Sequence, residues 1–512
     1  MKQIFQIAFT VAVFSLFAAS ASFSQDTAAP DSASGALPPA SLASTFFGMD
    51  VNQNNSTDPW PSTVATISFG TYRTLGSGGQ TKWADVYNCS TNTYTWTNFD
   101  KWMSLASTNG QKVMVTAYYT PECLTAYTGT NADNSCAFGS QPSGCDLPSD
   151  LNSDGTGADQ IWKTYISTLV THVVDTYGTG FLKYLEVWNE PNITTECNPN
   201  HNCTEAALAR MVEDANTTAK GIDSSIQIIS PAVTSKYIGD TDTTDCIQQA
   251  AQIAPYLNTL LSQKLTGSTY IIPQYADIIG FHGYIHIPAQ GVDSGSPDPA
   301  SGAACIASLI SSVQSTVSPY TTKQIFDTEG SWGGDCSPTG CTYLPNTWIT
   351  NPTPPQTMST QERAFTGIYY LIQASNTACQ TSGCNSMAGF SWYGWDFTNT
   401  GGFWNQTSQT LTPAGQAYAR VHNWLTTHSV TPTVPCSASG SVWTCNFTGT
   451  GTYKSEATWD TSQTCDETAG ACSTVSRTAP SWATDYLDLY GVDHTITGGQ
   501  VPVGLLPILL HN

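Results

Sequence analysis

Residues Leu185–Asn192 read LEVWNEPN, an apolar run that ends in an aromatic residue, an amide, a carboxylate and a proline. The run begins at Leu182, and its continuous apolar character is typical of a strand buried on both faces of a parallel sheet. Seven further runs of this kind recur along the chain, each closed by a polar or glycine-containing turn. The eight runs begin at Phe46, Ile67, Lys112, Leu182, Ile226, Ala276, Lys323 and Met387.

Amphipathic helical patterns lie between several of these runs. They read WTNFDKWMSLAST before the third run, ADQIWKTYISTLVTHVVDTY before the fourth, TEAALARMVEDANTTAKGI before the fifth and TQERAFTGIYYLIQAS before the eighth. Strands that alternate with helices in this way predict an α/β fold, a (β/α)8 TIM barrel with long insertions. A doubly wound open sheet is the alternative, but the sequence lacks its Gly-rich phosphate-binding turn after the first strand.

Both ends of the chain differ from the predicted barrel. Residues 1–25 combine one lysine, an apolar core and small residues, which predicts a secretory signal peptide, with a retained anchor as the alternative. Residues 26–41 are rich in Ala, Ser and Pro and predict a flexible leader. After a helical pattern that ends near His428, short alternating Thr- and Ser-rich runs predict a small all-β, sandwich-like domain over residues 429–512. The barrel is therefore expected over residues 42–428.

Charged residues are scarce and mostly acidic. They make up 11% of the chain, and the net charge is -22, which argues against nucleic acid as a partner. Beyond the N-terminus no apolar stretch is long enough to span a membrane, so we expect a secreted protein, extracellular or periplasmic. We also expect a monomer. Because only 16 Lys and Arg and 8 His are present, little repulsion builds up when carboxylates protonate, which predicts an acidic activity optimum.

An even number of cysteines, 16, in a chain expected to be secreted predicts disulfides. A metal cluster is the weaker alternative, because the spacings lack paired zinc-type motifs. The pairs suggested by proximity are Cys197/Cys203, Cys336/Cys341, Cys379/Cys384, Cys436/Cys445 and Cys465/Cys472, with Cys246/Cys305 as a longer one. The pairing of Cys89, Cys123, Cys136 and Cys145 stays open.

Two carboxylates stand at the ends of predicted strands, where a (β/α)8 barrel carries its active site. The fourth run ends at Glu190 and the seventh at Glu329. Glycoside hydrolysis needs such a pair, one acid to protonate the leaving oxygen and one carboxylate to attack or to activate water. A single Glu after an apolar run is more often a solvated turn residue, but the pair favours catalysis. The sequence contains no GxSxG, HExxH or papain-type motif, which argues against a protease.

These motifs resemble a known group of enzymes. LEVWNEPN and IFDTEGSWG are similar to the strand-four and strand-seven motifs of the retaining glycoside hydrolases with a (β/α)8 barrel, the clan that includes families 5, 39 and 51. FHGY in the sixth run and FSWYGWD in the eighth agree with this pattern. The segment ending VPVGLLPILL resembles the small β-domain of family-39-like enzymes. The resemblance implies a secreted hydrolase that cleaves β-glycosidic bonds of a neutral poly- or oligosaccharide by double displacement.

The resemblance also implies roles for single residues. Glu190 matches the acid/base and Glu329 the nucleophile, with an expected separation of roughly 5–5.5 Å. The substrate-binding or supporting positions that it implies are Asn189, Arg73, His282, Tyr284 and Trp392, where Asn189 reads the sugar 2-hydroxyl and Trp392 lies under the sugar.

Two more residues are interpreted from the sequence alone. Trp332, in a predicted loop, could stack on a sugar ring or pack under the loop. Asp327 lies two residues before Glu329 and is expected on the same face of the strand.

Carboxylate chemistry requires no metal and no organic cofactor. A metal site at His282 and His286 is a weaker alternative. A catalytically weak carbohydrate-binding or cell-surface protein on the same barrel would keep the fold, and a transglycosylase would use the same residues.

Overall fold

The computed structural model describes twelve stretches of the chain. They are residues 41–51, 67–75, 81–128, 144–235, 246–265, 269–284, 299–331, 359–378, 383–395, 402–405, 408–466 and 471–512. The predicted signal peptide, the predicted leader up to residue 40, His286 and Trp332 lie outside these residues.

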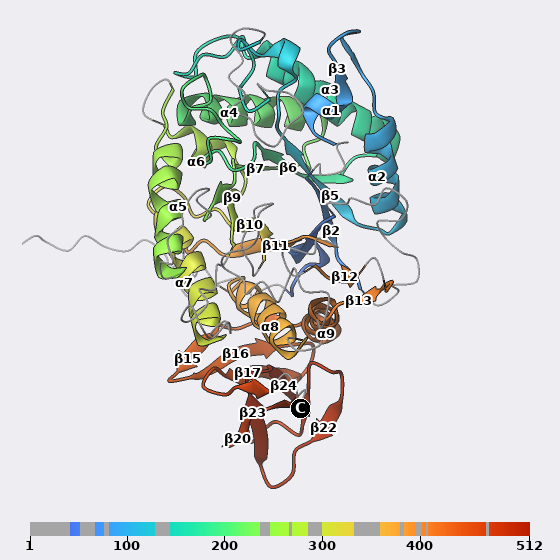
Figure 1. Ribbon diagram of the computed structural model, residues 1–512, viewed down its shortest axis with the longest axis vertical. Coiled ribbons are helices and arrows are strands. Elements are labelled where there is room, and N and C mark those ends of the chain that lie inside the picture. The colour runs from blue at the N-terminus through green and yellow to red at the C-terminus, as the bar shows by residue number, and fades with distance from the viewer. Residues whose placement is uncertain are drawn as a thin grey trace, which may run out of the picture. The chain divides into compact units, whose positions relative to one another are not determined.

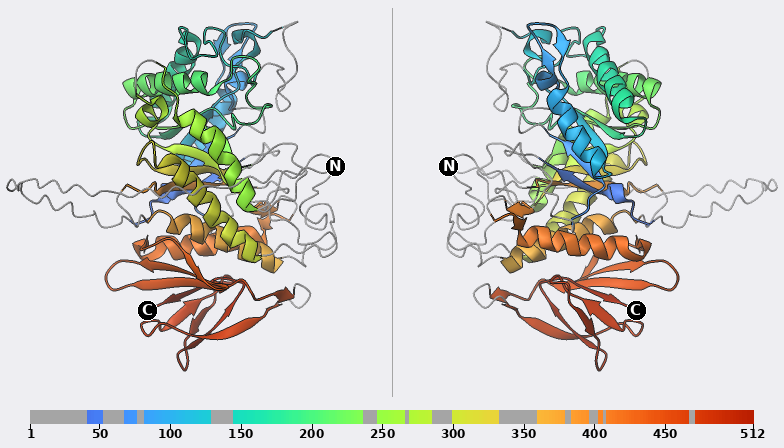
Figure 2. Two further views of the ribbon diagram at one scale, coloured as in Figure 1. Left: turned by 90° about the vertical axis from the view of Figure 1, so that its left-hand side faces the viewer. Right: turned by 90° about the vertical axis from the view of Figure 1, so that its right-hand side faces the viewer.

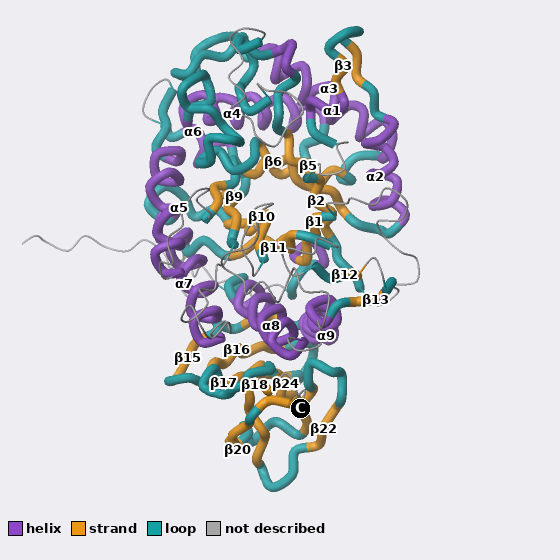
Figure 3. The backbone as a smooth tube through the Cα atoms, in the orientation of Figure 1, coloured by secondary structure: helices purple, strands orange, loops and turns teal. Residues whose placement is uncertain are grey.

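Eight strand positions form a ring at the centre of the larger part of the chain (Figure 3). The strands pair in parallel in the order β7-β6-β5-β2-β1-β11-β10-β9-β8. Their bounds are β1 Phe47–Asp50, β2 Thr71–Thr74, β5 Lys112–Ala117, β6 Leu182–Val187, β7 Gln227–Ile229, β8 Val233–Thr234, β9 Ile279–His282, β10 Ile325–Gly330 and β11 Met387–Tyr393. Because β7 and β8 are successive parts of one run and pair with opposite ends of the series, they close the ring. Each of the eight predicted runs supplies one of these positions, so the predicted barrel is confirmed.

Helices surround the ring (Figure 1). Their bounds are α1 Trp83–Val86, α2 Thr97–Thr108, α3 Gln160–Tyr177, α4 Glu205–Ile222, α5 Cys246–Leu261, α6 Ile271–Tyr275, α7 Pro299–Val317, α8 Ser359–Ser375 and α9 Pro413–Thr426. Two short hairpins, β3 Tyr87–Asn88 with β4 Thr93–Tyr94 and β12 Trp404–Asn405 with β13 Thr410–Leu411, lie in the connections. Within the described residues, none of these helices is long and apolar enough to cross a bilayer.

The barrel interior changes character along its axis. One layer is apolar and is built from Met114, Tyr184, Ile229, Ile278 and Phe326. Because side chains alternate along a strand, the inward positions two residues further on, Thr116 on β5 and Glu186 on β6, are polar and fully buried. The charged site described below therefore sits directly above an apolar floor.

The C-terminal strands form antiparallel sheets next to α8 and α9 (Figure 2). The strands are β14 Thr431–Pro432, β15 Ser437–Ser439, β16 Val442–Thr448, β17 Lys454–Asp460, β18 Cys465–Asp466, β19 Ala471–Cys472, β20 Thr474–Thr478, β21 Asp485–Leu487, β22 Asp493–Thr495, β23 Gln500–Gly504 and β24 Ile508–His511. The backbone N–H of Cys436 donates to Ser375 Oγ at the end of α8, 2.9 Å away. The predicted all-β segment is confirmed, while the division of the chain at residues 428 and 429 stays a prediction.

Four disulfides lie within the described residues. Three are pairs predicted from proximity, Cys197–Cys203, Cys436–Cys445 and Cys465–Cys472. The fourth, Cys89–Cys123, joins two cysteines whose pairing the sequence left open. The other predicted pairs each include a side chain outside the described residues.

A buried carboxyl pair lies at the start of α3. Asp159 precedes the helix in the left-handed region, at φ 47°, and its buried carboxyl shares a hydrogen bond with Asp214 on α4. Burial and the nearby Asp214 on α4 raise the pKa of Asp159 to about 9. The folded protein therefore holds a proton on Asp159 at neutral pH that the unfolded chain releases.

We expect Asp159→Asn to flatten the pH dependence of stability. The pKa of Asp159 is higher in the folded protein than in the unfolded chain, where it is near 4. The stability that this difference provides is therefore complete below about pH 4 and is lost as the pH rises towards 9. In the wild type this group contributes a slope of up to about 1.4 kcal/mol per pH unit in that window. Asn is neutral throughout and tolerates the left-handed region. Urea unfolding at pH 5, 7 and 9 measures the slopes, with the exposed Asp154→Asn as the matched control; an unchanged slope in Asp159→Asn would contradict the expectation.

Candidate active site

Arg73 on β2 is the centre of the site. Its guanidinium is fully buried. Its Nη1 donates to Asp50 Oδ1 at 3.0 Å and to Glu329 Oε2 at 2.8 Å. Its Nε and Nη2 donate to Glu186 Oε2 at 3.0 and 2.7 Å, and Nη2 also donates to Asn189 Oδ1 at 3.1 Å. One cation thus joins four strands of the barrel and fixes the side chains at their ends.

Glu329, at the end of β10, has two donors. Besides Arg73, the hydroxyl of Tyr284 donates to Glu329 Oε1. Both donors are buried, and the Glu329 side chain is 7% exposed. Burial and then the charge of Glu329 raise the pKa of Tyr284 well above its usual value, so its hydroxyl keeps the proton that it donates. The carboxylate is therefore held in one orientation with its charge compensated.

Glu190 follows β6 and lies across from Glu329. Its side chain is 12% exposed, more than that of any other carboxylate of this cluster, and its Oε1 lies 2.9 Å from Nδ1 of the buried His282. His282 Nε2 lies 3.3 Å from Arg73 Nη2, which can only donate, so Nδ1 carries the hydrogen that bonds to Glu190. Burial lowers the pKa of His282, but Glu329 and Glu190 raise it more, and the net shift is upward.

The turn after β6 presents Glu190 to the barrel mouth. Trp188 and Glu190 adopt positive φ values of 67° and 40°, which turn the backbone sharply on either side of Asn189. The turn is held by Trp188 Nε1, which donates to the backbone oxygen of Glu196 at 2.9 Å, and by Asn192 Nδ2, which donates to the backbone oxygen of Thr234 at 2.9 Å. Strained residues of this kind cluster at functional sites.

The two predicted catalytic carboxylates are close together. One atom each of Glu190, His282 and Glu329 lies within 4.8 Å of the others. A metal ion could in principle be bound by such a trio. Arg73, however, already places a positive charge 2.8 Å from Glu329 Oε2, and a second cation there would be repelled. The trio therefore fits acid–base chemistry better than metal binding.

Asp327 does not share the face of Glu329, so this expectation is wrong. The register with β9 shifts between Asp327 and Glu329, and this irregularity reverses the alternation of side chains. Asp327 Oδ2 accepts from Gln373 Nε2 on α8 at 2.6 Å, and Oδ1 accepts from the backbone N–H of Gly283 at 2.9 Å. Burial raises the pKa of Asp327 to about 8. Asp327 therefore fastens the segment between His282 and Tyr284 to α8.

The structure does not bring Trp392 into the site. Its ring is fully buried and packs against Tyr370 at 5.7 Å and Phe403 at 4.8 Å, on the side of β11 that faces the helices. A ring in that position cannot lie under a sugar. Because neighbouring residues of a strand point to opposite faces, Tyr393 takes the inward position, with its ring centroid 6.1 Å from that of Tyr284.

Sequence reasoning missed two carboxylates of the cluster. Asp50, at the end of β1, and Glu186, within β6, are fully buried around Arg73. Thr116 Oγ1 also donates to Glu186 Oε2, at 2.6 Å. Burial raises the pKa of Asp50 well above its usual value, against the opposing effect of Arg73. The sequence did contain a signal for them, which is a charged residue inside an apolar run. A buried strand tolerates a charged side chain only when that side chain is paired.

Comparison with known proteins supports the fold. No family model matches the chain, and no curated protein matches it. A solved monomeric β-xylosidase from Caulobacter crescentus CB15 aligns over 92% of this chain and 97% of its own, with a TM-score of 0.53 and 15% identity. A family 39 glycoside hydrolase from Xanthomonas axonopodis pv. citri aligns over 92% and 95%, with a TM-score of 0.52 and 14% identity.

A third solved structure has the same architecture in another family. The family 51 arabinofuranosidase from Xanthomonas axonopodis pv. citri aligns over 93% of this chain and 97% of its own, with a TM-score of 0.54 and 11% identity. At such identities the likeness concerns the fold. The described residues thus adopt the (β/α)8 barrel with a C-terminal β-domain found in glycoside hydrolases of families 39 and 51.

Proposed function

We propose that this protein is a retaining glycoside hydrolase that cleaves β-glycosidic bonds of a neutral poly- or oligosaccharide. The observation that carries the proposal is the pair Glu190 and Glu329, with one oxygen of each within 4.8 Å of the other at the mouth of the barrel. Retaining enzymes hold their two carboxyl groups about 5–5.5 Å apart, whereas inverting enzymes leave about 6.5–9.5 Å for a water molecule. The short separation therefore favours double displacement.

In the first step of this mechanism Glu329 attacks the anomeric carbon. Arg73 and Tyr284 both donate to its carboxylate, so the attacking oxygen is oriented before substrate binds. The glycosidic bond breaks as Glu190 transfers a proton to the leaving oxygen. Because His282 Nδ1 donates to Glu190 Oε1, the proton of Glu190 resides on Oε2.

In the second step water hydrolyses the glycosyl-enzyme. Formation of the ester removes the negative charge of Glu329, so Glu190, now ionised, can accept a proton from water. The water attacks from the side that the leaving group occupied, Glu329 departs as a carboxylate, and Glu190 regains its proton. Two inversions give net retention.

Asn189 and Tyr393 are proposed to contact the sugar. Asn189 Oδ1 accepts from Arg73, and the amide also hydrogen-bonds to Glu196, which leaves one N–H as a donor to a substrate hydroxyl. Tyr393 faces the same interior as Tyr284 and offers an aromatic face, the role that the sequence had suggested for Trp392. Trp332 lies outside the described residues, and its role stays a prediction.

Export from the cell fits this function. Disulfides such as Cys89–Cys123 and Cys197–Cys203 form and persist in oxidising compartments, and polysaccharides are extracellular substrates. We therefore propose a secreted enzyme, extracellular or periplasmic, that acts without a cofactor.

The stereochemistry of the product tests the proposal. Wild-type protein is incubated with aryl β-glycosides and with a panel of polysaccharides, and the anomer released first is read by proton NMR. We expect the β-anomer first, and a 2-deoxy-2-fluoro β-glycoside is expected to label Glu329 in a peptide map. Release of the α-anomer would contradict the retaining mechanism, and glycan binding without turnover of any substrate would contradict the enzymatic function.

A further inference from the structure

Glu196 is another carboxyl beside the catalytic pair, and the mechanism does not use it. It lies six residues after Glu190 in the chain and is 7% exposed. The charges that act on its carboxyl are those of Glu190, Lys82 and Glu329, and the Asn189 side chain hydrogen-bonds to it. The carboxyl therefore faces the catalytic cluster.

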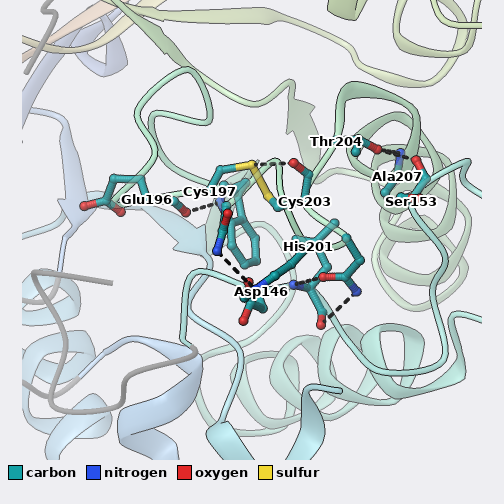
Figure 4. Close-up of a disulfide and its surroundings, with 12 residues drawn as sticks. Asp146, Ser153, Glu196, Cys197, His201, Cys203, Thr204 and Ala207 are labelled. Atoms are coloured by element: carbon teal, nitrogen blue, oxygen red, sulfur yellow. Dashed lines mark hydrogen bonds and ion pairs between the residues drawn. A yellow bond between two sulfur atoms is a disulfide. The ribbon is translucent and has the colours of Figure 1, made fainter. Parts of the chain in front are cut away.

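The backbone around Glu196 is fixed. Its N–H donates to the backbone oxygen of Ile193 at 3.0 Å, and its own oxygen accepts from Trp188 Nε1 at 2.9 Å. The next residue, Cys197, is bonded to Cys203. Figure 4 shows the Glu196 side chain extending away from this disulfide. The local structure thus directs a rigid carboxyl towards the cluster.

One oxygen of this carboxyl lacks a partner. Glu196 Oε2 is buried, and no group in the described part of the chain bonds to it. A buried polar atom without a partner is destabilising, and a bound ligand is one of the explanations for keeping it. Burial first, and then Glu190, raise the pKa of Glu196 to about 8. Below that pH the carboxyl is neutral and can donate one hydrogen bond as well as accept others.

A further positive group borders this position. The ammonium of Lys82 lies 4.7 Å from the ring centroid of Tyr119 and 5.6 Å from that of Tyr118, at the end of β5. Its charge opposes the effect of burial on Glu196 but does not overcome it. The result is a polar, aromatic-walled position next to Glu190 and Asn189, which suits a hydroxyl-bearing ring.

We propose that Glu196 is a substrate-binding residue whose carboxyl hydrogen-bonds to a sugar hydroxyl beside the scissile bond. This inference rests on the proposed glycoside hydrolase function. A hydroxyl suits this position because it can accept the proton of the carboxyl and donate to its other oxygen, which satisfies both groups. An anion could only accept, and an ammonium could only donate.

The test combines variants with substrates that each lack one hydroxyl. Deleting the hydroxyl that Glu196 contacts is expected to lower kcat/KM of the wild type about 10-fold, as expected for one neutral hydrogen bond. Glu196→Ala is expected to lose the same factor on the complete substrate and to be indifferent to that deletion. Glu196→Gln keeps a donor and an acceptor, so its kcat/KM on the complete substrate is expected to lie between those of the wild type and Glu196→Ala. If Glu196→Ala and Glu196→Gln both respond to every deletion as the wild type does, the inference is overturned.

The pH dependence of KM gives a second readout, independent of folding defects. Above about pH 8 the wild-type carboxyl ionises and loses its donor, so KM is expected to rise, whereas Glu196→Gln is expected to show no such inflection. Glu456→Gln, in which a carboxyl on β17 with a pKa also raised by burial is replaced, is the matched control and should behave as the wild type. An inflection that persists in Glu196→Gln would contradict the assignment. A wild type without glycosidase activity would instead refute the proposed function itself.

Discussion

Glu329→Ala is expected to lower kcat on aryl β-glycosides by about 10⁴-fold, the order of loss seen when an essential nucleophile is removed. The reason is that three neighbouring carboxyl groups are held by other partners and are not available to replace it. Asp327 is directed to α8 by the register shift, and Asp50 and Glu186 are buried behind Arg73. The activity of the purified variant is measured next to that of the wild type at the same pH.

Azide separates the two carboxylate roles. In Glu329→Ala, azide can enter the space left by the side chain and attack from that face, which is expected to give an α-glycosyl azide. In Glu190→Ala, azide attacks the glycosyl-enzyme without needing a base and is expected to give the β-glycosyl azide. Glu456→Ala serves as the control with full activity. If Glu329→Ala gave the β-glycosyl azide and Glu190→Ala gave the α-glycosyl azide, the roles of Glu190 and Glu329 would be exchanged.

Arg73→Met is expected to reduce the free energy of unfolding by about 3–5 kcal/mol, because removal of one partner leaves buried charges uncompensated. Glu186 would lose both of its contacts to the guanidinium, and Glu329 would lose the donor at 2.8 Å. The substitution keeps much of the side-chain volume, so the effect reports mainly on charge. Urea unfolding near neutral pH provides the measurement.

Two further variants test the cause. Adding Glu186→Gln to Arg73→Met is expected to recover part of the lost stability, because the amide is neutral. Arg477→Met is the matched control, since the Arg477 side chain is 41% exposed in its pair with Asp460, and such a pair contributes about 0–1 kcal/mol. An Arg73→Met variant no less stable than Arg477→Met would show that the buried network contributes nothing to folding.

The predicted barrel rested on a physical signal that is strong in this chain. Strands covered on both faces must be apolar along their whole length, and a sequence with only 11% charged residues makes such runs easy to distinguish from their turns. Each of the eight runs lies on the ring. The helical patterns before the third, fourth, fifth and eighth runs correspond to α2, α3, α4 and α8.

The positions of several candidate site residues could be predicted because they depend on local sequence. Glu190 and Glu329 stand at the ends of buried runs, and His282 and Tyr284 follow from the same reasoning. Glu186 was missed because a charge inside an apolar run has no visible partner in the sequence. Its partner, Arg73, lies 113 positions away in the chain and meets it only because β2 and β6 flank β5 in the barrel.

The sequence by itself determined the strands, their order along the chain and the two carboxylates at their ends, because burial and strand termini leave local patterns. Only the tertiary structure decided which way each side chain points. A register shift in β10 separated Asp327 from Glu329, and the alternation along β11 placed Tyr393, instead of Trp392, in the interior. Both outcomes depend on pairing with neighbouring strands, which a single chain of letters does not contain.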